Sequence, residues 1–429
     1  MAELFLKFVR LLKWIIMSNP IEQVLEQINR LYKSHYGKMV SSLLYFSQSI
    51  DVETAEDIVQ DAFASALTHW REEGMPANPA GWIFKVCRNK ALNKIKQGEK
   101  VRGFFENEDF DAVETEVSES PIDDQQLKLL FACAHQDFSP KVQVVITLKY
   151  VINLKVEAIA KILGMTIDGV DKLLLRARQK IREENILFTE PDLFFLKYRL
   201  PIVHKIIYLI FNEGYKSSWG KEIIREELCE DALLMNRALL ESGIGNKETA
   251  ALHALMLFNA ARFKARFGSS GELLDLEEQD RSLWNNELII YASKFLSQSQ
   301  GGTISSYHYE ASIAYLHCMA KDFKSTDWIS ISKLYNQLLQ NSPNPFVEMN
   351  YAIALYYSGQ KQKAFDILYS LKQKPILNQY YLLNAALGKL NFLEGNYATA
   401  KIYLLATLHQ TDSQLEKDYV QKMMASLDS

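Results

Sequence analysis

Residues Val156–Leu175 read VEAIAKILGMTIDGVDKLLL. The apolar residues of this stretch recur at three- and four-residue spacing, which indicates two helices. Ala160 allows these helices to cross closely, and Gly164 supplies the positive φ that ends the first of them. Thr166 can cap the second helix, and Val170 is placed on its inner face. The sequence therefore predicts a helix-turn-helix, a motif whose second helix enters the major groove of DNA.

Basic residues follow the second helix of this pattern. Alternate positions carry cations that are placed to contact phosphates, at Arg176, Arg178, Lys180 and Arg182. A second basic run lies upstream, where seven Lys or Arg and one acid occur between Trp82 and Arg102. Basic side chains interleaved with aromatic ones can track a nucleic-acid backbone and stack on unpaired bases. An ordinary helical hairpin is the alternative for the first segment and a solvated helix face for the second, but the two together favour DNA binding.

Acidic residues gather in two other places. From Glu106 to Asp124 there are nine Asp or Glu and no Lys or Arg, which is typical of a solvated linker. Upstream, Asp57, Gln60 and Asp61 share one face of a predicted helix. An acidic exposed face suits a basic protein surface better than a phosphate backbone, and we therefore expect a protein to dock there. Stabilisation of the helix dipole is the alternative for the acids nearest the helix start.

The composition of the whole chain hides these local charges. Of its 429 residues 48% are hydrophobic, and 48 Lys and Arg nearly balance 52 Asp and Glu, for a formal charge of −4. The length predicts roughly two to four domains, at about 100–200 residues each. A near-neutral sum argues against a nucleic-acid binder only if the cations are spread evenly. Here they are clustered, so the local runs carry the information.

No sequence motif points to catalysis or to a bound metal. The four cysteines lie dozens of residues apart, without a CxxC or a zinc-finger spacing. We therefore expect no cofactor, no metal site and a cytoplasmic, reducing location. A P-loop, Rossmann glycines, an HExxH motif and a nucleophile elbow are also missing from the sequence, and we expect no enzyme activity.

Two segments bear on contact with membranes. The most apolar stretch, from Phe194 to Phe211, is interrupted by charged residues and by Pro201, so no stable membrane insertion is expected. Residues 1–16 place Leu and Phe side chains on one helix face, as a helix lying on a membrane surface does. A start codon assigned too early is the favoured interpretation of these residues, because Met17 opens a more ordinary beginning.

The third and longest part of the chain is helical and weakly repetitive. Almost every segment has helical spacing, and no sustained period-two alternation occurs, so the predicted fold class is all-α. Residues 344–371 align with residues 380–408, and Gly359 then matches Gly395 at an offset of 36. A small-residue helix, a glycine turn and a second helix form the unit of tetratricopeptide repeats, whose period is about 34. A generic pair of helical hairpins is the alternative.

Several segments together resemble a known family. AEDIVQDAFASAL (55–67) and NPAGWIFKVCRNKALNKIK (78–96) precede the acidic linker, and SPKVQVVITLKYVINLKVEAIAKILG (139–164) follows it. Over about residues 21–184 the chain resembles bacterial RNA polymerase sigma factors of the extracytoplasmic-function class. The rest is similar to the subgroup that carries a tetratricopeptide-like C-terminal extension, for example in RLPIVHKIIYLIFNEGY (199–215).

The resemblance implies five parts. These are an N-terminal extension over residues 1–20, sigma region 2 over 21–97, an acidic linker over 98–124, a region 4 helix-turn-helix over 125–184, and a helical extension with tetratricopeptide-like repeats over 185–429. Region 2 would bind the polymerase clamp and the −10 promoter element, whereas region 4 would bind the −35 element.

The resemblance also implies roles for individual residues. The helix that grips the clamp of core RNA polymerase would use Asp57, Gln60 and Asp61. The −10 element would be melted and held by Asn78, Trp82, Lys85, Arg88, Asn89 and Lys94. The −35 element would be read by Thr166, Asp168, Asp171, Lys172, Arg176 and Arg178. Asp168 and Asp171 stand where basic or neutral residues are usual in this family, so the promoter sequence does not follow from the resemblance.

The implied function is promoter-specific transcription initiation, with core RNA polymerase and promoter DNA as partners. We expect the C-terminal extension to control this activity in cis, by sensing a small molecule, binding a protein or contacting polymerase. The alternative is a helix-turn-helix transcriptional regulator whose C-terminal helices bind an effector or a partner. The acidic face at Asp57, Gln60 and Asp61 separates the two hypotheses, because a plain repressor needs no polymerase dock.

Overall fold

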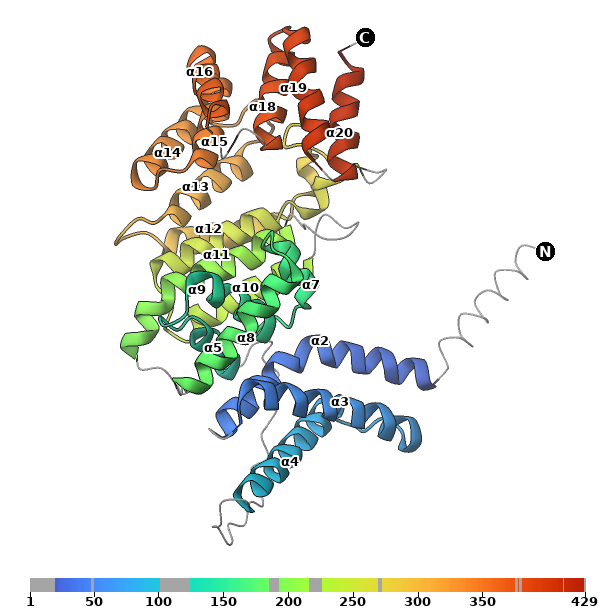
Figure 1. Ribbon diagram of the computed structural model, residues 1–429. Coiled ribbons are helices and arrows are strands. Elements are labelled where there is room, and N and C mark those ends of the chain that lie inside the picture. Colours follow the sequence, from blue (N-terminus) through green and yellow to red (C-terminus); the bar gives the residue numbers. More distant parts are fainter. Residues whose placement is uncertain are drawn as a thin grey trace, which may run out of the picture. The chain divides into compact units, whose positions relative to one another are not determined.

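The computed structural model describes most of the chain as helices joined by short turns (Figure 1). The residues that it describes are 20–47, 50–100, 124–184, 193–215, 226–268, 272–374, 377, 380–411 and 413–427. The expected N-terminal extension and nearly all of the acidic linker therefore lie outside the described residues. The chain divides into two compact units, Met1–Leu239 and Leu240–Ser429.

The first unit begins with three helices that pack on one another, α2 (Pro20–Phe46), α3 (Val52–Glu73) and α4 (Pro79–Lys100) (Figure 1). The Asp51 side chain caps α3 by accepting a hydrogen bond from the backbone N–H of Thr54, at 2.9 Å. Trp70 from α3 is 1% exposed, so this large ring lies in the core of the three-helix group. Burial of such a ring is a major stabilising contribution in a small domain.

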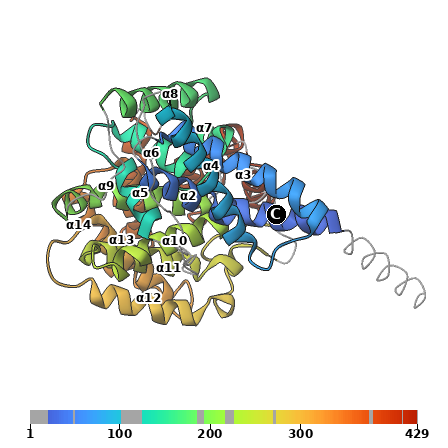
Figure 2. The same ribbon diagram turned by 90° about the horizontal axis from the view of Figure 1, so that it is seen from below.

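Four shorter helices follow and contain the predicted helix-turn-helix. They are α5 (Asp124–Cys133), α6 (Pro140–Tyr150), α7 (Val156–Ile162) and α8 (Ile167–Glu183). Gly164 has φ +59° in the turn between α7 and α8, and the Thr166 hydroxyl accepts a hydrogen bond from Gly169 N–H at 3.1 Å. Val170 is fully buried against the rest of the motif. The geometry predicted for residues 156–175 is confirmed, and Figure 2 shows α6, α7 and α8 gathered together.

Two more helices follow, α9 (Leu193–Tyr215) and α10 (Glu226–Glu241), and the first unit ends near the end of α10, at Leu239. α9 packs against α5 and α6, so the first helix after residue 184 is part of the same compact body as the helix-turn-helix. Arg199, which is 6% exposed, donates a hydrogen bond from Nη1 to the Phe131 carbonyl at 3.0 Å. A buried arginine bonded to a distant backbone carbonyl fixes α9 on α5.

The second unit is a succession of helices, each in contact with its neighbours (Figure 1). Its elements are α11 (Lys247–Ala260), η1 (Phe263–Arg266), η2 (Arg281–Leu283), α12 (Asn286–Gln298), α13 (Ser306–Met319), α14 (Trp328–Asn341), α15 (Pro345–Tyr357), α16 (Lys361–Lys372), α18 (Tyr381–Leu393), α19 (Tyr397–Gln410) and α20 (Gln414–Ala425). Apart from an isolated bridge between Phe267 and Leu273, the regular elements described for the chain are helical. The all-α fold class is confirmed.

The predicted repeat corresponds to two helical hairpins, α15–α16 and α18–α19. Gly359 and Gly395 occupy the two turns with φ +93° and +76°, a conformation that L side chains rarely adopt. Ala364 and Ala400, each five residues after its glycine, are fully buried where the second helix crosses the first. Small residues at the crossing let the two helices of each hairpin approach closely.

Among the described residues, no helix is long and apolar enough to cross a membrane.

Candidate nucleic-acid and protein interfaces

The acidic face of α3 is exposed. Asp57, Gln60 and Asp61 all lie on the solvent side, while Val59 and Ala62 of the same helix are fully buried. Lys90 Nζ lies 3.9 Å from the Asp61 carboxylate, but the Asp61 side chain remains 73% exposed. Such an exposed pair contributes little to stability. The three predicted docking residues therefore form one accessible acidic edge.

The basic face of α4 is also exposed, through Lys85, Asn89 and Lys94. The helix start is fixed by Asn78, whose side-chain oxygen accepts a hydrogen bond from the backbone N–H of Gly81 at 2.9 Å. Asn78 thus has a capping role in addition to any contact with DNA. Arg88 is half-buried, with its guanidinium 5.7 Å from the centre of the Phe46 ring.

Trp82 is held between neighbouring rings rather than projecting freely from α4. It stacks on His69, with ring centres 5.2 Å apart, and meets Trp70 edge-on at 5.6 Å. Trp82 is half-buried and lies on the same helix as the exposed Lys85 and Lys94. An anchored aromatic ring next to cations is suited to stacking on an unpaired base.

The outer face of α8 carries five of the six residues predicted to read DNA. Thr166, Asp168, Asp171, Lys172 and Arg176 are all exposed. Asp168 forms an ion pair with Lys172 at 2.7 Å, one helical turn later. This pairing offsets the negative charge that would otherwise repel a phosphate. Asp171 has no such partner among the ion pairs found in the described part of the chain.

Arg178 is turned away from the other five residues. Its Nη2 lies 3.1 Å from the carboxylate of Glu56 in α3, and its Nε donates to the Tyr150 hydroxyl at 3.0 Å. The sequence places Arg178 in a basic run at the end of α8. Its neighbour Ala177, however, belongs to the buried face of this helix, and Arg178 lies at the edge of that face. In this arrangement its guanidinium is engaged by protein groups.

Glu56 lies at the centre of a contact that the sequence did not predict. An acid in the first two turns of a helix suits the dipole and is ordinarily solvated, yet Glu56 is 5% exposed. It is surrounded by Tyr36, Lys149 and Arg178, which are far from it along the chain. No local pattern in the sequence signals this burial, because Arg178 is 122 residues away.

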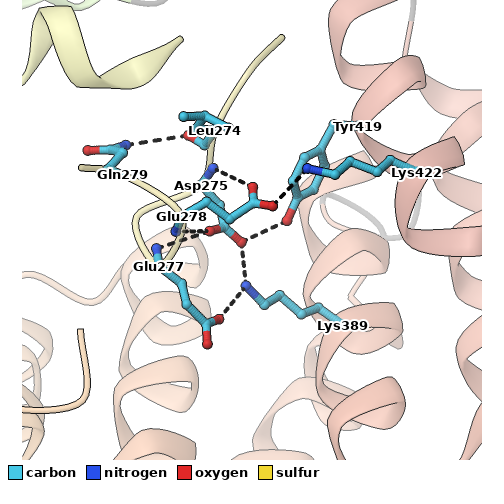
Figure 3. Close-up of polar contacts among 8 residues, drawn as sticks. All are labelled: Leu274, Asp275, Glu277, Glu278, Gln279, Lys389, Tyr419 and Lys422. Carbon is cyan, nitrogen blue, oxygen red and sulfur yellow. Dashed lines mark hydrogen bonds and ion pairs between the residues drawn. The ribbon is translucent and has the colours of Figure 1, made fainter. Parts of the chain in front are cut away.

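The second unit contains another polar cluster, in which a loop meets two distant helices (Figure 3). Asp275, between η1 and η2, accepts hydrogen bonds from Lys389 of α18 and from the hydroxyl of Tyr419 of α20, the latter at 2.8 Å. Lys389 also lies 3.1 Å from the Glu277 carboxylate, and Lys422 lies 3.1 Å from Glu278. Figure 3 shows these side chains converging on the loop from α18 and α20. The described residues contain no group of His, Cys, Asp and Glu that could hold a metal ion.

Comparison with known families identifies two segments of the first unit. A model of sigma-70 region 2 matches residues 31–101, and a model of sigma-70 region 4 matches residues 129–181. The chain belongs to the sigma-70 family. The two matched regions are of the extracytoplasmic-function type, as the resemblance implied. Sigma factors of this family are non-enzymatic initiation factors with a role in promoter recognition.

The extension of this sigma-70 family member has relatives as well. Residues 199–300 match a family of unknown function, DUF6596, which begins inside α9 and ends after α12. The uncharacterized protein R00370 of Rhizobium meliloti (strain 1021) is 30% identical over 359 residues, which cover 82% of this chain and 84% of that protein. No solved structure matches the chain. The similarity to R00370 thus extends well beyond the sigma regions.

Proposed function

We propose that this protein is a sigma factor that binds core RNA polymerase and directs promoter-specific initiation from the cytoplasm. Asp57, Gln60 and Asp61 on α3 would dock on a basic surface of the polymerase clamp. The exposed face of α4 would hold and melt the −10 element, and α8 would read the −35 element. The observation that carries this proposal is the presence of both sigma regions in one chain, with most of their predicted contact residues exposed.

The region 2 match disfavours the alternative, a helix-turn-helix regulator with an effector domain. Such a regulator needs α7 and α8 but has no use for residues 31–101, whose exposed acidic edge is suited to a protein partner.

Transcription with purified components tests the proposed function. The full chain is added to core RNA polymerase and to genomic fragments, and start sites are mapped together with footprints of the holoenzyme. We expect protected −35 and −10 elements and transcripts that depend on the chain. Absence of any transcript or footprint, with polymerase that responds to another sigma factor, would contradict the proposal.

We further propose that the C-terminal extension controls initiation in cis. This proposal is supported by the packing of α9 on α5 and α6, which couples the start of the extension to region 4. The test compares the full chain with a chain that ends at Leu239, where the first compact unit ends. Circular dichroism confirms that the shorter chain is folded. We expect severalfold different transcription from the same promoter, and identical output at every promoter tested would contradict control by the second unit.

A further inference from the structure

Region 2 and region 4 meet around one buried carboxylate. Glu56 of α3 accepts a hydrogen bond from the Tyr36 hydroxyl at 3.0 Å, and both of these residues belong to region 2. From region 4 come Lys149, at 3.4 Å from one carboxylate oxygen, and Arg178, at 3.1 Å from the other. The side chain of Glu56 is 7% exposed. Removing one partner of a buried ion pair is strongly unfavourable, because the remaining charge stays desolvated.

The backbone fits closely around this contact. Gly37 of α2 faces the end of α6 so tightly that an added Cβ would lie 2.7 Å from the carbonyl oxygen of Val151. α2 also packs against α5, and an outer ion pair joins Glu53 to Arg182 at 3.9 Å. Since a carbonyl oxygen cannot move without shifting its helix, only glycine allows the two regions to approach this closely at position 37.

This contact is incompatible with simultaneous binding of both promoter elements. Elements centred at −35 and −10 are about 25 base pairs apart, or about 85 Å along a straight duplex. Domains of this size are each about 30 Å across, so two of them in contact span only about 60 Å. In addition, Arg178 is bonded to Glu56 and Tyr150 rather than presented to DNA.

We propose that Glu56 is the centre of a latch that holds region 4 against region 2 in the free chain and opens when polymerase and promoter are bound. The inference rests on the proposed sigma function. Asp57, Gln60 and Asp61 stay exposed on the same helix while the latch is closed. Polymerase can therefore bind the closed chain first, and separation of the two regions then frees Arg178 for the −35 element.

Distance measurements on the full chain test whether the latch exists. Spin labels are placed on two exposed positions, Ala64 of α3 and Lys161 of α7, after substitution by cysteine in a Cys318→Ser background. The other three native cysteines are buried. Pulsed EPR should give one narrow distance distribution in the otherwise unchanged chain, because the closed contact fixes region 4 on region 2. A broad distribution in that chain would overturn the proposal.

Two unrelated substitutions should open the latch. Glu56→Gln removes the charge that binds Lys149 and Arg178, and Gly37→Ala introduces the Cβ that meets Val151. Each should raise the ratio of open to closed chain by about tenfold or more. Glu56→Gln weakens hydrogen bonds to a charged group. Gly37→Ala creates a steric overlap with the backbone of region 4. Glu53→Gln, on the same helix but in an exposed pair, is the matched control and should leave the distribution unchanged. If both test variants are folded and keep the same narrow distance distribution, the latch is refuted.

A reversible cross-link connects the latch to function. Glu53→Cys and Arg182→Cys are bridged by a short bis-methanethiosulfonate, and a monofunctional reagent on the same cysteines is the control. The bridged chain should still bind core polymerase but lose at least about tenfold in promoter-dependent transcription, with recovery after dithiothreitol. Full activity of the bridged chain would overturn the latch. Inactivity of the unbridged control in every assay would instead contradict the sigma function, and the EPR result would still decide whether the latch exists.

Discussion

Asp275 lies in the loop between η1 and η2, but its hydrogen-bond partners come from α18 and α20 (Figure 3). Burial alone would raise the pKa of this carboxyl group. The ammonium group of Lys389 and the hydrogen bonds from Lys389 and Tyr419 outweigh burial and hold the pKa below its ordinary value. Because the folded pKa is depressed, this carboxylate stabilises the fold above the unfolded pKa, and the contribution is lost as the pH falls through the folded pKa.

Asp275→Asn should lower the local stability of α18 and α20 by about 1.5–3 kcal/mol at pH 7, because hydrogen bonds to a charged group are lost. The difference from the parent chain should shrink as the pH falls below about 4, where the carboxylate of the unfolded parent chain begins to protonate, and it should vanish only below the depressed pKa of the folded chain. Hydrogen exchange of peptides from these helices measures both effects. The exposed Asp366→Asn is the control, with an expected change below about 0.5 kcal/mol. A pH-independent difference would be inconsistent with this account.

His317, in α13, is a second residue whose environment changes its titration. Burial, together with Arg262 and Arg281 nearby, lowers the pKa of His317 to about 3. The folded chain therefore keeps this ring neutral, while the unfolded chain protonates it near pH 6.5. The free energy of unfolding is therefore unaffected by this ring above about pH 6.5. Below that pH it decreases by about 1.4 kcal/mol per pH unit, until the pH reaches the folded pKa of about 3.

His317→Phe should remove the part of the pH dependence of unfolding that comes from His317, since a phenyl ring cannot take up a proton. Hydrogen exchange in α13 between pH 6 and pH 4 should give a slope of stability against pH that is smaller by about 1.4 kcal/mol per unit than in the parent. Equal slopes in the two chains would show that His317 does not control the acid response.

At the scale of elements, α3 carries two different faces one residue apart. Glu56 points into region 4, whereas Asp57, Gln60 and Asp61 face solvent. The double substitution Asp57→Lys with Asp61→Lys should weaken binding of core polymerase by about tenfold or more, because it places like charges opposite a basic partner. Fluorescence anisotropy with labelled chain measures the affinity. Glu72→Lys, at the exposed end of the same helix, is the control. Equal affinity of the parent, the double variant and the control would exclude the acidic edge as the polymerase-binding surface.

The crossing of α18 and α19 depends on Gly388. An added Cβ at this position would lie 2.7 Å from the Leu404 side chain, so the two helices would have to move apart. Gly388→Val should therefore destabilise the hairpin by about 1–3 kcal/mol, as overpacking does in other cores. Thermal unfolding measures the change, with Ala398→Val on the exposed face of α19 as the control. A larger loss in the control than in Gly388→Val would contradict this packing explanation.

Local patterns predicted the elements well, because the decisive contacts lie within a few residues. The turn at Gly164, the cap at Thr166 and the glycine turns of the repeats all have the predicted geometry. Glu56 and Asp275 could not be predicted, because their partners lie up to 122 and 144 residues away and share no local pattern with them. The sequence shows which residues have charge, whereas burial and partners depend on how distant helices pack.

At the scale of the whole molecule, the formal charge of −4 conceals separate acidic and basic faces. If Lys85 of α4 contacts a promoter phosphate, Lys85→Gln should reduce the slope of log K against log salt by about 0.7–0.9 for holoenzyme binding to promoter DNA. Lys205→Gln, an exposed site on α9 with the same change in net charge, should leave the slope unchanged. Filter binding between low and moderate salt measures both slopes. Equal slopes for the parent and Lys85→Gln would exclude a phosphate contact at Lys85.

The hydrogen bonds from α18 and α20 to the loop at Asp275 have a consequence for how the second unit comes apart. In an open solenoid each repeat touches only its neighbours, so the array can peel away from a free end. Here the last helices are tied to a segment near the beginning of the same unit. The end cannot fray without breaking bonds to that early segment, and the unit should therefore lose its structure as one cooperative block.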